Sequence, residues 1–278
     1  MITQLEPYNE IHTKSLLRQL FSKGQISINE IYTLLGTDNI NNGRQYTLPD
    51  INSDIVSFTP AMLKPQGANY TAAIQPYENL VRNEYINGNY FHIRFQNLIS
   101  NERMIINIKT QKEAVNIMKY LSLKETENSY KSLPTAINSM KFYALHSLGR
   151  RTALKCDKIV IYYERRNRDD VYQMIIEAAR VFNIPSANFL TPISGFYHLA
   201  GRNDGSYRVG IGVEISGTSF TKERTRNIFR KLTGRDFSNS NAQTQYGYSY
   251  QEADATIFVD ELYSHGVIGC KDFLTPQF

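Results

Sequence analysis

The chain has 278 residues, of which 41% are apolar and 21% charged, and this composition excludes an intrinsically disordered protein. Its two cysteines are too few for a disulfide scaffold or a cysteine-rich metal site, and no apolar run reaches transmembrane length. The N-terminus lacks a signal-peptide pattern, so we expect a cytoplasmic protein, with secretion into a host cell as the alternative. The net charge of +5 favours an acidic or phosphorylated partner.

The first part of the chain is predicted to be helical. Apolar residues at helical spacing indicate two helices between residues 8 and 36, the second capped by Ser27. A long irregular connection rich in Asn, Asp, Gly and Pro is expected from 37 to 69, followed by a helix from 71 to 86. We therefore expect residues 1–86 to form an N-terminal helical region with a long irregular loop.

From residue 87 onwards the pattern changes to strands alternating with helices. Strands 90–98 and 103–109 are expected to form a hairpin, because only a short turn separates them. The continuous apolar run 157–164 predicts a buried central strand. Further segments are expected as strands at 140–148, 196–201 and 209–213, as helices after Thr110, at 170–182 and after Ser219, as a loop at 123–137, and as a weak helix or strand at 256–262.

This order of elements predicts an α+β fold: a mixed or antiparallel sheet flanked by helices, with an N-terminal helical layer. We expect residues 87–278 to form the α+β domain and this domain to contain the catalytic residues.

Residues 209–232 join a strand to a basic helix. Val209, Ile211 and Val213 alternate with glycines, and Ser219 or Thr218 is a suitable N-cap for the helix that follows. The helix carries five cations: Lys222, Arg224, Arg226, Arg230 and Lys231. Amide groups at a helix start beside guanidinium groups indicate an anion site, while the alternative is an ordinary solvated basic face.

Several chemistries are excluded by missing motifs. The chain has no phosphate-binding loop, no dinucleotide fingerprint, no HExxH and no GxSxG. Its five histidines are scattered without the spacing of metal ligands, so no metal is expected. Cys156 at the entrance of a strand is interpreted as a small buried residue rather than a nucleophile.

The strands supply an unusual number of basic and aromatic side chains. His92 and Arg94 share one face of their strand, as do Lys141 and Tyr143 of another, because residues two apart point the same way. A lysine desolvated by Phe142 or Tyr143 could act as a general base, and nearby guanidinium groups could bind phosphate. These parts suit β-elimination from a phosphorylated serine or threonine. The alternatives are a snorkelling strand lysine at 141 and an ordinary surface or core histidine at 92.

The C-terminal half resembles the HopA-type bacterial effector family. Asp157, Val160 and Tyr162 match its "D-x-x-V-x-Y" strand, and residues 209–212 match its "G-V-G-I-G" strand. Ser219, Phe220 and Arg224 match its "S-F-G-x-x-R" helix start, with Thr221 where glycine is usual. RMIINIK at 103–109 also looks like the family's "R-x-Y-x-N" strand, and the resemblance covers roughly residues 88 to 235.

The resemblance implies a relationship to lyase partners in lanthipeptide biosynthesis and, more distantly, to phosphothreonine lyases of the OspF type. In that pattern Lys141 matches the base. The acid is either His92 or another group such as a tyrosine, since the family's register puts the histidine position at Ile105 or Ile106 instead. The candidate phosphate-binding residues are Arg94, Arg151, Lys155, Arg208, Lys222 and Arg224.

The expected function is therefore a phosphoserine/phosphothreonine lyase in lanthipeptide-type maturation. We expect a phosphorylated peptide as substrate, made by a separate kinase that could also be a bound subunit, and no cofactor, membrane or nucleic acid. The alternative is a non-catalytic effector-like module that binds a protein through its basic helix.

Overall fold

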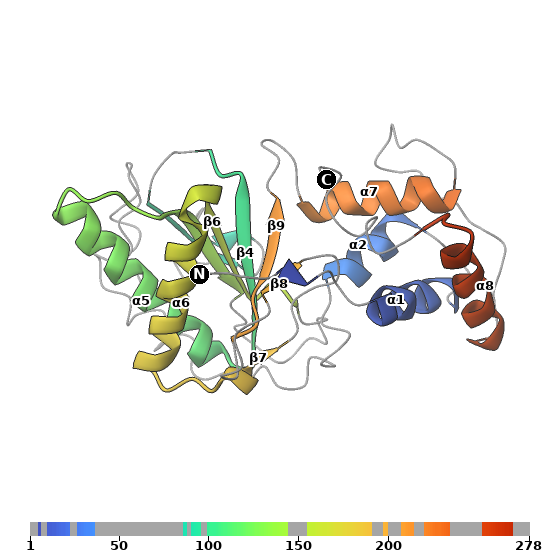
Figure 1. Ribbon diagram of the computed structural model, residues 1–278, viewed down its shortest axis with the longest axis horizontal. Coiled ribbons are helices and arrows are strands. Elements are labelled where there is room, and N and C mark those ends of the chain that lie inside the picture. The colour runs from blue at the N-terminus through green and yellow to red at the C-terminus, as the bar shows by residue number, and fades with distance from the viewer. Residues whose placement is uncertain are drawn as a thin grey trace.

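The computed structural model describes residues 5–6, 10–22, 27–36, 86–87, 90–95, 99–143, 155–190, 197–199, 207–213, 220–233 and 252–268. These residues form two halves: a sheet with two helices against it, and a separate group of four helices (Figure 1). The predicted α+β class with N-terminal helices is confirmed. Within the described ranges, no helix is both long and apolar enough to cross a membrane.

An antiparallel sheet makes up the centre of the first half. Its order is β1-β8-β9-β4-β6-β5-β3-β2, with β7 pairing at the end of β4. The strands in chain order are β1 (Leu5–Glu6), β2 (Ile86–Asn87), β3 (Tyr90–Arg94), β4 (Glu102–Ile108), β5 (Ile137–Tyr143), β6 (Ile159–Tyr163), β7 (Phe189–Leu190), β8 (Tyr197–Leu199) and β9 (Gly210–Val213).

The apolar segment at 159–163 is a central strand, as predicted, but the predicted hairpin is wrong. β3 pairs with β5, and β4 pairs with β6 and β9. All seven residues of β4 are buried, which requires strands on both of its edges and cover on both faces. In the sheet, β5 and β6 therefore lie between β3 and β4.

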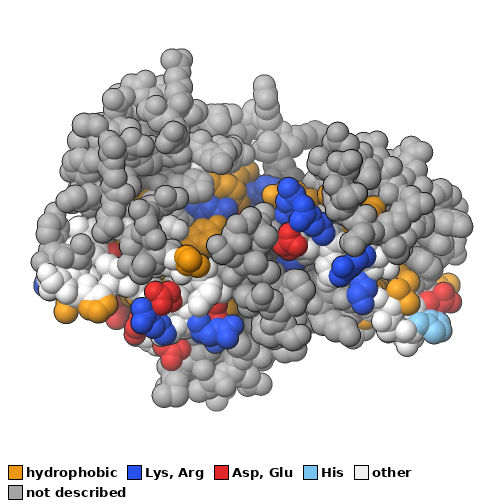
Figure 2. Space-filling view, turned by 90° about the horizontal axis from the view of Figure 1, so that it is seen from above, with side chains coloured by type: hydrophobic (Ala, Val, Ile, Leu, Met, Phe, Trp, Pro, Cys, Tyr) orange, Lys and Arg blue, Asp and Glu red, His pale blue; other side chains and the backbone are white. Residues whose placement is uncertain are grey.

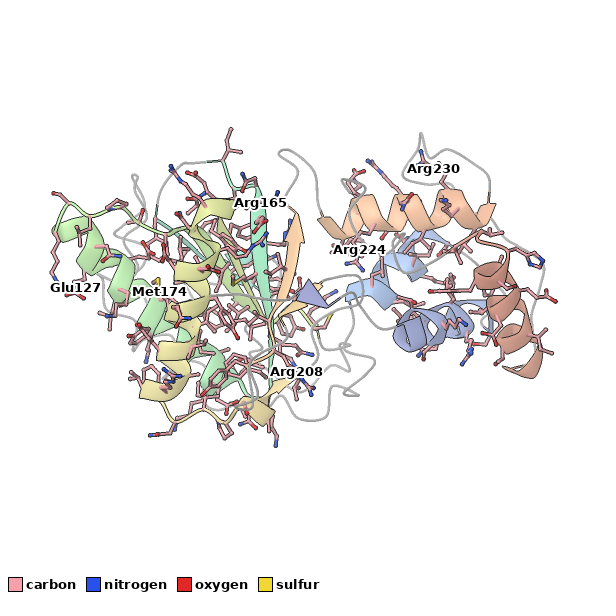
Figure 3. The ribbon with its side chains drawn as sticks, in the orientation of Figure 1. Glu127, Arg165, Met174, Arg208, Arg224 and Arg230 are labelled. Carbon is pink, nitrogen blue, oxygen red and sulfur yellow. The ribbon has the colours of Figure 1, made fainter. Side chains whose placement is uncertain are left out.

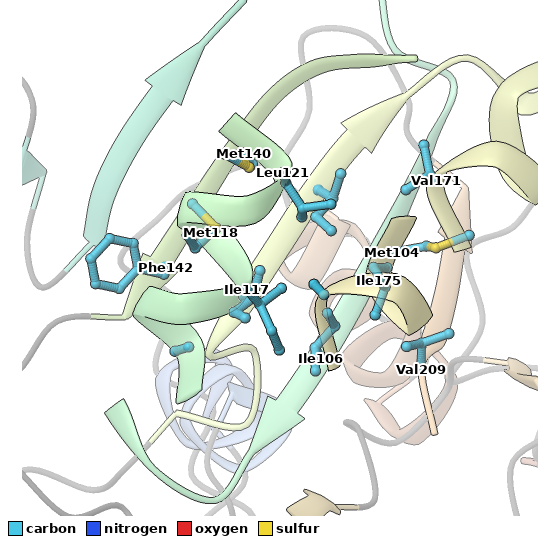
Figure 4. Close-up of a cluster of buried hydrophobic side chains, with 14 of the residues drawn as sticks. Met104, Ile106, Ile117, Met118, Leu121, Met140, Phe142, Val171, Ile175 and Val209 are labelled. Carbon is cyan, nitrogen blue, oxygen red and sulfur yellow. The ribbon is translucent and has the colours of Figure 1, made fainter. Parts of the chain in front are cut away.

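One face of the sheet is covered by α5 (Gln111–Tyr130) and α6 (Arg168–Val181), as Figure 1 shows. Every second residue of the strands points to this face and packs against the apolar side of the two helices. Strands and helices therefore share one hydrophobic core. Burying each such large side chain contributes about 1.5–3 kcal/mol. Figure 4 shows Met104, Ile106, Met140 and Phe142 from the sheet, Ile117, Met118 and Leu121 from α5, and Val171 and Ile175 from α6.

α5 is longer than expected. The segment predicted as a loop from 123 to 137 continues the helix as far as Tyr130. Its polar composition indicated a loop, but Lys and Glu are good helix formers, and Leu121 and Glu125 face inward four residues apart. On α6, Val181 lies three residues after the buried Ala178 but is 58% exposed, because it is the last residue of the helix.

The start of α5 is fixed by a capping box. Thr110 Oγ1 accepts the Glu113 N–H at 3.2 Å, and the Glu113 carboxylate accepts the Thr110 N–H at 3.1 Å. Ser27 and Glu30 form the same motif at the start of α2 (Ile28–Gly36), which confirms the predicted cap.

We expect Thr110→Ala to lower the free energy of unfolding by about 1 kcal/mol, because it removes the oxygen that accepts a helix-start N–H. Urea denaturation followed by circular dichroism measures the difference. Thr110→Ser keeps the hydroxyl and should stay close to wild type. Equal midpoints for the alanine and serine variants would contradict the role of the cap.

The second half contains helices from both ends of the chain. α1 (Glu10–Ser22) and α2 pack against α7 (Phe220–Thr233) and α8 (Glu252–Ser264) around a core of their own. The two predicted N-terminal helices are confirmed, and the segment at 256–262 is a helix rather than a strand. The core residues are Leu16, Leu17, Leu20, Phe21, Ile31, Leu34, Leu35, Ile228, Phe229, Ala255, Val259 and Ile268.

The proposed boundary at residue 86 stays a prediction, although α7 and α8 lie with α1 and α2 rather than beside the sheet (Figure 1). The irregular connection at 37–69 and most of the helix at 71–86 lie outside the described residues, as do residues 144–148 of the third predicted strand.

Candidate functional site

The sheet face opposite α5 and α6 has a different composition from the core face. Across six strands the register aligns one row: His198, Gly210, Ile105, Val160, Lys141 and His92. A second row aligns Gly212, Arg103, Tyr162, Ser139 and Arg94. Asn107, Lys158, Tyr143 and Tyr90 continue the same alternation on the other side of the first row. We call these three rows the polar face.

Lysine and arginine side chains gather in the middle of the molecule, where the sheet half and the helical half meet. Figure 2, seen from above, shows them there beside hydrophobic side chains. This combination of cations and apolar surface is suited to an anionic ligand, because the apolar walls lower the local dielectric around the charges.

Lys141 lies half-buried on β5, one strand in from β3 at the end of the first row. Its Nζ lies 4.2 Å from the centre of the Tyr90 ring. The Tyr90 hydroxyl donates to Asp157 Oδ1 at 2.5 Å, and the Tyr90 and Tyr143 rings lie 5.4 Å apart. The aromatic environment expected for this lysine therefore exists, but Tyr90 supplies its closest ring contact. Phe142 points to the other face, into the core.

His92 occupies the position directly opposite Lys141 in the β3–β5 pairing, and Arg94 is opposite Ser139. The family register had placed the histidine strand elsewhere, at Ile105 or Ile106, because β4 runs directly into a helix. Ile105 lies in the same row as Lys141 but two strands away, and Ile106 faces the core. The side chains of His92 and Arg94 lie outside the described part of the structure.

Two further cations on this face were not among the predicted site residues. Lys158 is 1% exposed, and its Nζ donates to Asn107 Oδ1 at 2.7 Å. Arg103 is largely buried, and its guanidinium carbon lies 5.1 Å from the centre of the Tyr162 ring. A sequence signal existed: Arg103, Ile105 and Asn107 alternate with the apolar residues of β4.

The basic helix α7 is not uniformly solvated. Arg224 is fully buried, and Figure 3 shows it on the side of α7 that faces α2. Lys222, Arg230 and Lys231 are exposed, and Arg226 Nη1 pairs with Glu223 at 2.8 Å. The interpretation of this helix as an ordinary basic face is therefore wrong for Arg224 and holds for the three exposed cations.

Two of the remaining predicted phosphate ligands, Arg208 and Lys155, lie in the described part of the structure. Arg208 is exposed just before β9, and Figure 3 shows it at the lower end of the sheet half, whereas Arg224 lies on α7 in the helical half. Lys155 lies with its Nζ 6.0 Å from the centre of the Tyr32 ring on α2. Arg151 lies outside the described residues.

Cys156 is buried, as expected, and joins the sheet to α2. Its Sγ donates to the Leu35 carbonyl at 3.7 Å, and its N–H donates to the Gly36 carbonyl at 3.4 Å. In the described ranges, no cluster of three or more His, Cys, Asp or Glu side chains is placed to hold a metal ion.

The fold and the polar face define an α+β protein with a cationic sheet face. No family model and no curated protein matches the chain. Among solved structures it is similar to the effector protein from Pseudomonas syringae pv. syringae strain 61, at 11% identity and a TM-score of 0.48, over 96% of this chain and 99% of that one. That protein is an effector, but a likeness of this degree carries no argument about this chain. The HopA-type and lyase relationships stay predictions.

Proposed function

We propose that the chain is a phosphoserine/phosphothreonine lyase that removes phosphate from a phosphorylated peptide by β-elimination. The observation that carries this proposal is the pairing of Lys141 with the His92 position on adjacent strands of the polar face. Arg103 and Lys158 add two cations to the flanking rows of that face. A base, an acid and cations for the phosphate are the groups that this reaction needs.

In the proposed step, an unprotonated Lys141 amine removes the proton from Cα of the phosphorylated residue. The electron pair of the Cα–H bond forms the Cα=Cβ double bond, and the Cβ–O bond breaks. Phosphate leaves with the electrons of that bond and takes a proton from His92. The products are inorganic phosphate and dehydroalanine from phosphoserine, or dehydrobutyrine from phosphothreonine.

The role of the cations is to stabilise negative charge that grows on the enolate oxygen and on the departing phosphate. Guanidinium groups suit this task because they bind phosphate oxygens in a fork. Arg103 and Arg94 lie in the row next to Lys141, which makes them the first candidates. Lys222 and Arg208 are exposed, so they are better suited than Arg103 to bind peptide residues on either side of the phosphorylated one.

The substrate would be a peptide phosphorylated by a separate kinase. The resemblance to HopA-type proteins supports a place in lanthipeptide-type maturation, where the dehydrated residue would then accept a cysteine thiol to form a thioether ring. The chemistry itself requires only a phosphorylated serine or threonine with an accessible Cα proton.

We expect wild type to convert a phosphothreonine peptide to the product lacking phosphoric acid, and Lys141→Ala to lower the rate by about 10²–10⁴-fold, the contribution typical of general base catalysis. Intact-mass spectrometry of the peptide measures both. Lys112→Ala is the matched control, because Lys112 is an exposed lysine on α5.

Equal conversion by wild type and Lys141→Ala would keep the lyase and move the base elsewhere. If the folded wild type converts none of the peptide, even with its kinase present, the lyase proposal is wrong.

The second candidate is a non-catalytic module that binds an acidic protein through α7. It is favoured by the exposure of Lys222, Arg230 and Lys231 on one helix. Replacing all three by glutamine would abolish binding to an acidic partner, whereas a lyase acting on a short phosphopeptide would keep its chemical step.

A further inference from the structure

Tyr90 connects the proposed base, Lys141, to the half-buried carboxylate of Asp157. Its ring lies 4.2 Å from Lys141 Nζ, and its hydroxyl donates to Asp157 Oδ1 at 2.5 Å. The face of an aromatic ring attracts an ammonium group at such a distance, so the ring is a defined resting place for the end of the lysine side chain.

The ring itself is held on three sides. The Tyr90 backbone pairs with Tyr143 on β5, the two rings lie 5.4 Å apart, and the hydroxyl is anchored on Asp157 just before β6. Burial, with the Asp157 carboxylate as the second cause, raises the pKa of Tyr90 well above its ordinary value of 10.0. The hydroxyl therefore stays protonated and keeps donating to Asp157, which makes Tyr90 a poor proton donor for a leaving phosphate.

We infer that Tyr90, locked by Asp157, is a positioning residue that fixes the amine of Lys141 on the polar face. Lysine has a flexible four-carbon side chain, and without such a contact its amine would sample many positions. The ring holds the lysine side chain in its charged form, so the side chain is already in place when it gives up its proton and acts as the base, which is the usual benefit of orientation in catalysis. The effect on rate rests on the proposed lyase activity, whereas the effect on the lysine does not.

Three substitutions test the ring, the hydroxyl and the Asp157 carboxylate separately. Tyr90→Leu removes the ring, Tyr90→Phe keeps the ring but loses the hydroxyl, and Asp157→Asn keeps an oxygen that can accept the hydroxyl proton. Tyr120→Leu is the matched control, because Tyr120 also has a lysine over its ring, Lys124 at 5.6 Å, but lies on α5.

The first measurement is the rate at which a limiting, isotope-coded acylating reagent modifies Lys141, relative to the exposed Lys112 in the same molecule. Peptide mass spectrometry gives the ratio without any lyase assay. We expect Tyr90→Leu to raise the ratio by about threefold to thirtyfold, the range that corresponds to losing one cation–π contact. Tyr90→Phe should raise it less, and Asp157→Asn and Tyr120→Leu should leave it near wild type.

The second measurement is the split between kcat and KM on the phosphothreonine peptide. Tyr90→Leu is expected to lower kcat by up to about 10²-fold with little change in KM, and phenylalanine at the same position to restore most of the loss. A purely structural role would lower the amount of folded enzyme instead, and the two constants of the folded fraction would stay the same.

The two measurements distinguish the possible failures. A raised labelling ratio in a protein that converts no peptide would keep the positioning of Lys141 and overturn the lyase. An unchanged ratio in Tyr90→Leu would overturn the positioning, whether or not the lyase is active. If Tyr90→Leu does not fold, an unchanged ratio in Tyr90→Phe overturns the part of the inference that depends on the hydroxyl, namely that Asp157 locks the ring.

Discussion

Raising the pH from 5 to 8 is expected to weaken the fold, and Glu125→Gln to remove much of that weakening. Glu125 is fully buried on α5, where its Oε1 accepts the N–H groups of Ala136 at 3.0 Å and Ile137 at 3.2 Å. Its other oxygen, Oε2, is buried with no hydrogen-bond partner in the part of the chain that the structure describes. Oε1 therefore links the helix to the start of β5, while Oε2 is held away from water without a hydrogen bond.

Burial raises the pKa of Glu125 from its ordinary 4.5 to about 7, although the two backbone N–H groups act in the opposite direction. Between these values the folded protein holds a proton that the unfolded chain has released. Stability that depends on this proton is therefore fully present below about pH 4.5 and is lost as the pH rises through about 7. The difference corresponds to an upper limit of about 3 kcal/mol.

Urea denaturation at a series of pH values from 5 to 8 measures this effect. Other titrating groups contribute equally to wild type and variant, so the informative quantity is the difference between their free energies of unfolding. Glu125→Gln keeps an oxygen that accepts the N–H groups of Ala136 and Ile137 but has no proton to lose. The free energy of unfolding of this variant should therefore rise relative to that of wild type as the pH rises. Glu127→Gln, at an exposed acid two residues away, should follow wild type.

Parallel curves for wild type and Glu125→Gln would mean that the carboxyl titrates normally in the folded protein. In that case water or a group outside the described residues would have to solvate Oε2.

Local sequence signals predicted the local structure well. Ser27 and Thr110 were recognised as caps because a small hydroxyl just before an apolar helix pattern is suited to accept a helix-start N–H. Both are followed three residues later by a glutamate that completes the capping box. The buried strand at 159–163 was likewise evident from its uninterrupted apolar run. Such signals depend only on residues within one turn or one strand.

Strand order could not be predicted in this way, because it is decided by contacts between distant segments. The short connection between β3 and β4 favoured a hairpin. In the structure β4 is buried along its whole length and pairs with β6 and β9 instead. This error also affected the site. The predicted hairpin said nothing of the strand of Lys141, whereas the observed order places β5 beside β3 and His92 opposite Lys141.

Two site residues carried a signal that was misread or not used. Arg224 lies four residues before Ile228, on the apolar side of α7, so its spacing alone indicated burial. Arg103 alternates with the core residues of β4, so its spacing indicated the polar face. For Arg224 the charge of the residue outweighed its position in the prediction, although a guanidinium can be buried when its surroundings satisfy it; the position of Arg103 was not used in the prediction at all.

Glu102→Gln is expected to lower the free energy of unfolding by about 3 kcal/mol, since removing one partner from a buried ion pair leaves charge uncompensated. Glu102 is 1% exposed at the start of β4. Its carboxylate accepts Arg165 Nε at 2.6 Å and Arg168 Nε at 2.9 Å, and it also binds Arg168 Nη2. The hydrogen bond to Glu102 is the largest cause of the raised pKa of Arg168.

The two arginines should contribute unequally. Arg165 is 61% exposed, so water screens its pair and Arg165→Met should cost less than about 1 kcal/mol. Arg168 is only 24% exposed, and it stands in the first turn of α6, where a helix dipole disfavours a cation. Glu102 offsets both penalties, so Arg168→Met, which leaves the carboxylate with one exposed partner, should cost much more than Arg165→Met. Chemical denaturation of the three variants measures these differences.

Glu164→Gln is the matched control, because Glu164 pairs only with the exposed Arg166 among the ion pairs of the described residues and should cost about 0.5 kcal/mol or less. If Glu102→Gln is no worse than this control, the cluster contributes nothing beyond a surface pair. If the loss is near the expected size, the cluster fixes the start of β4 against the first turn of α6. Arg103 is the next residue on that strand, so the same contacts would then hold one cation of the polar face in place.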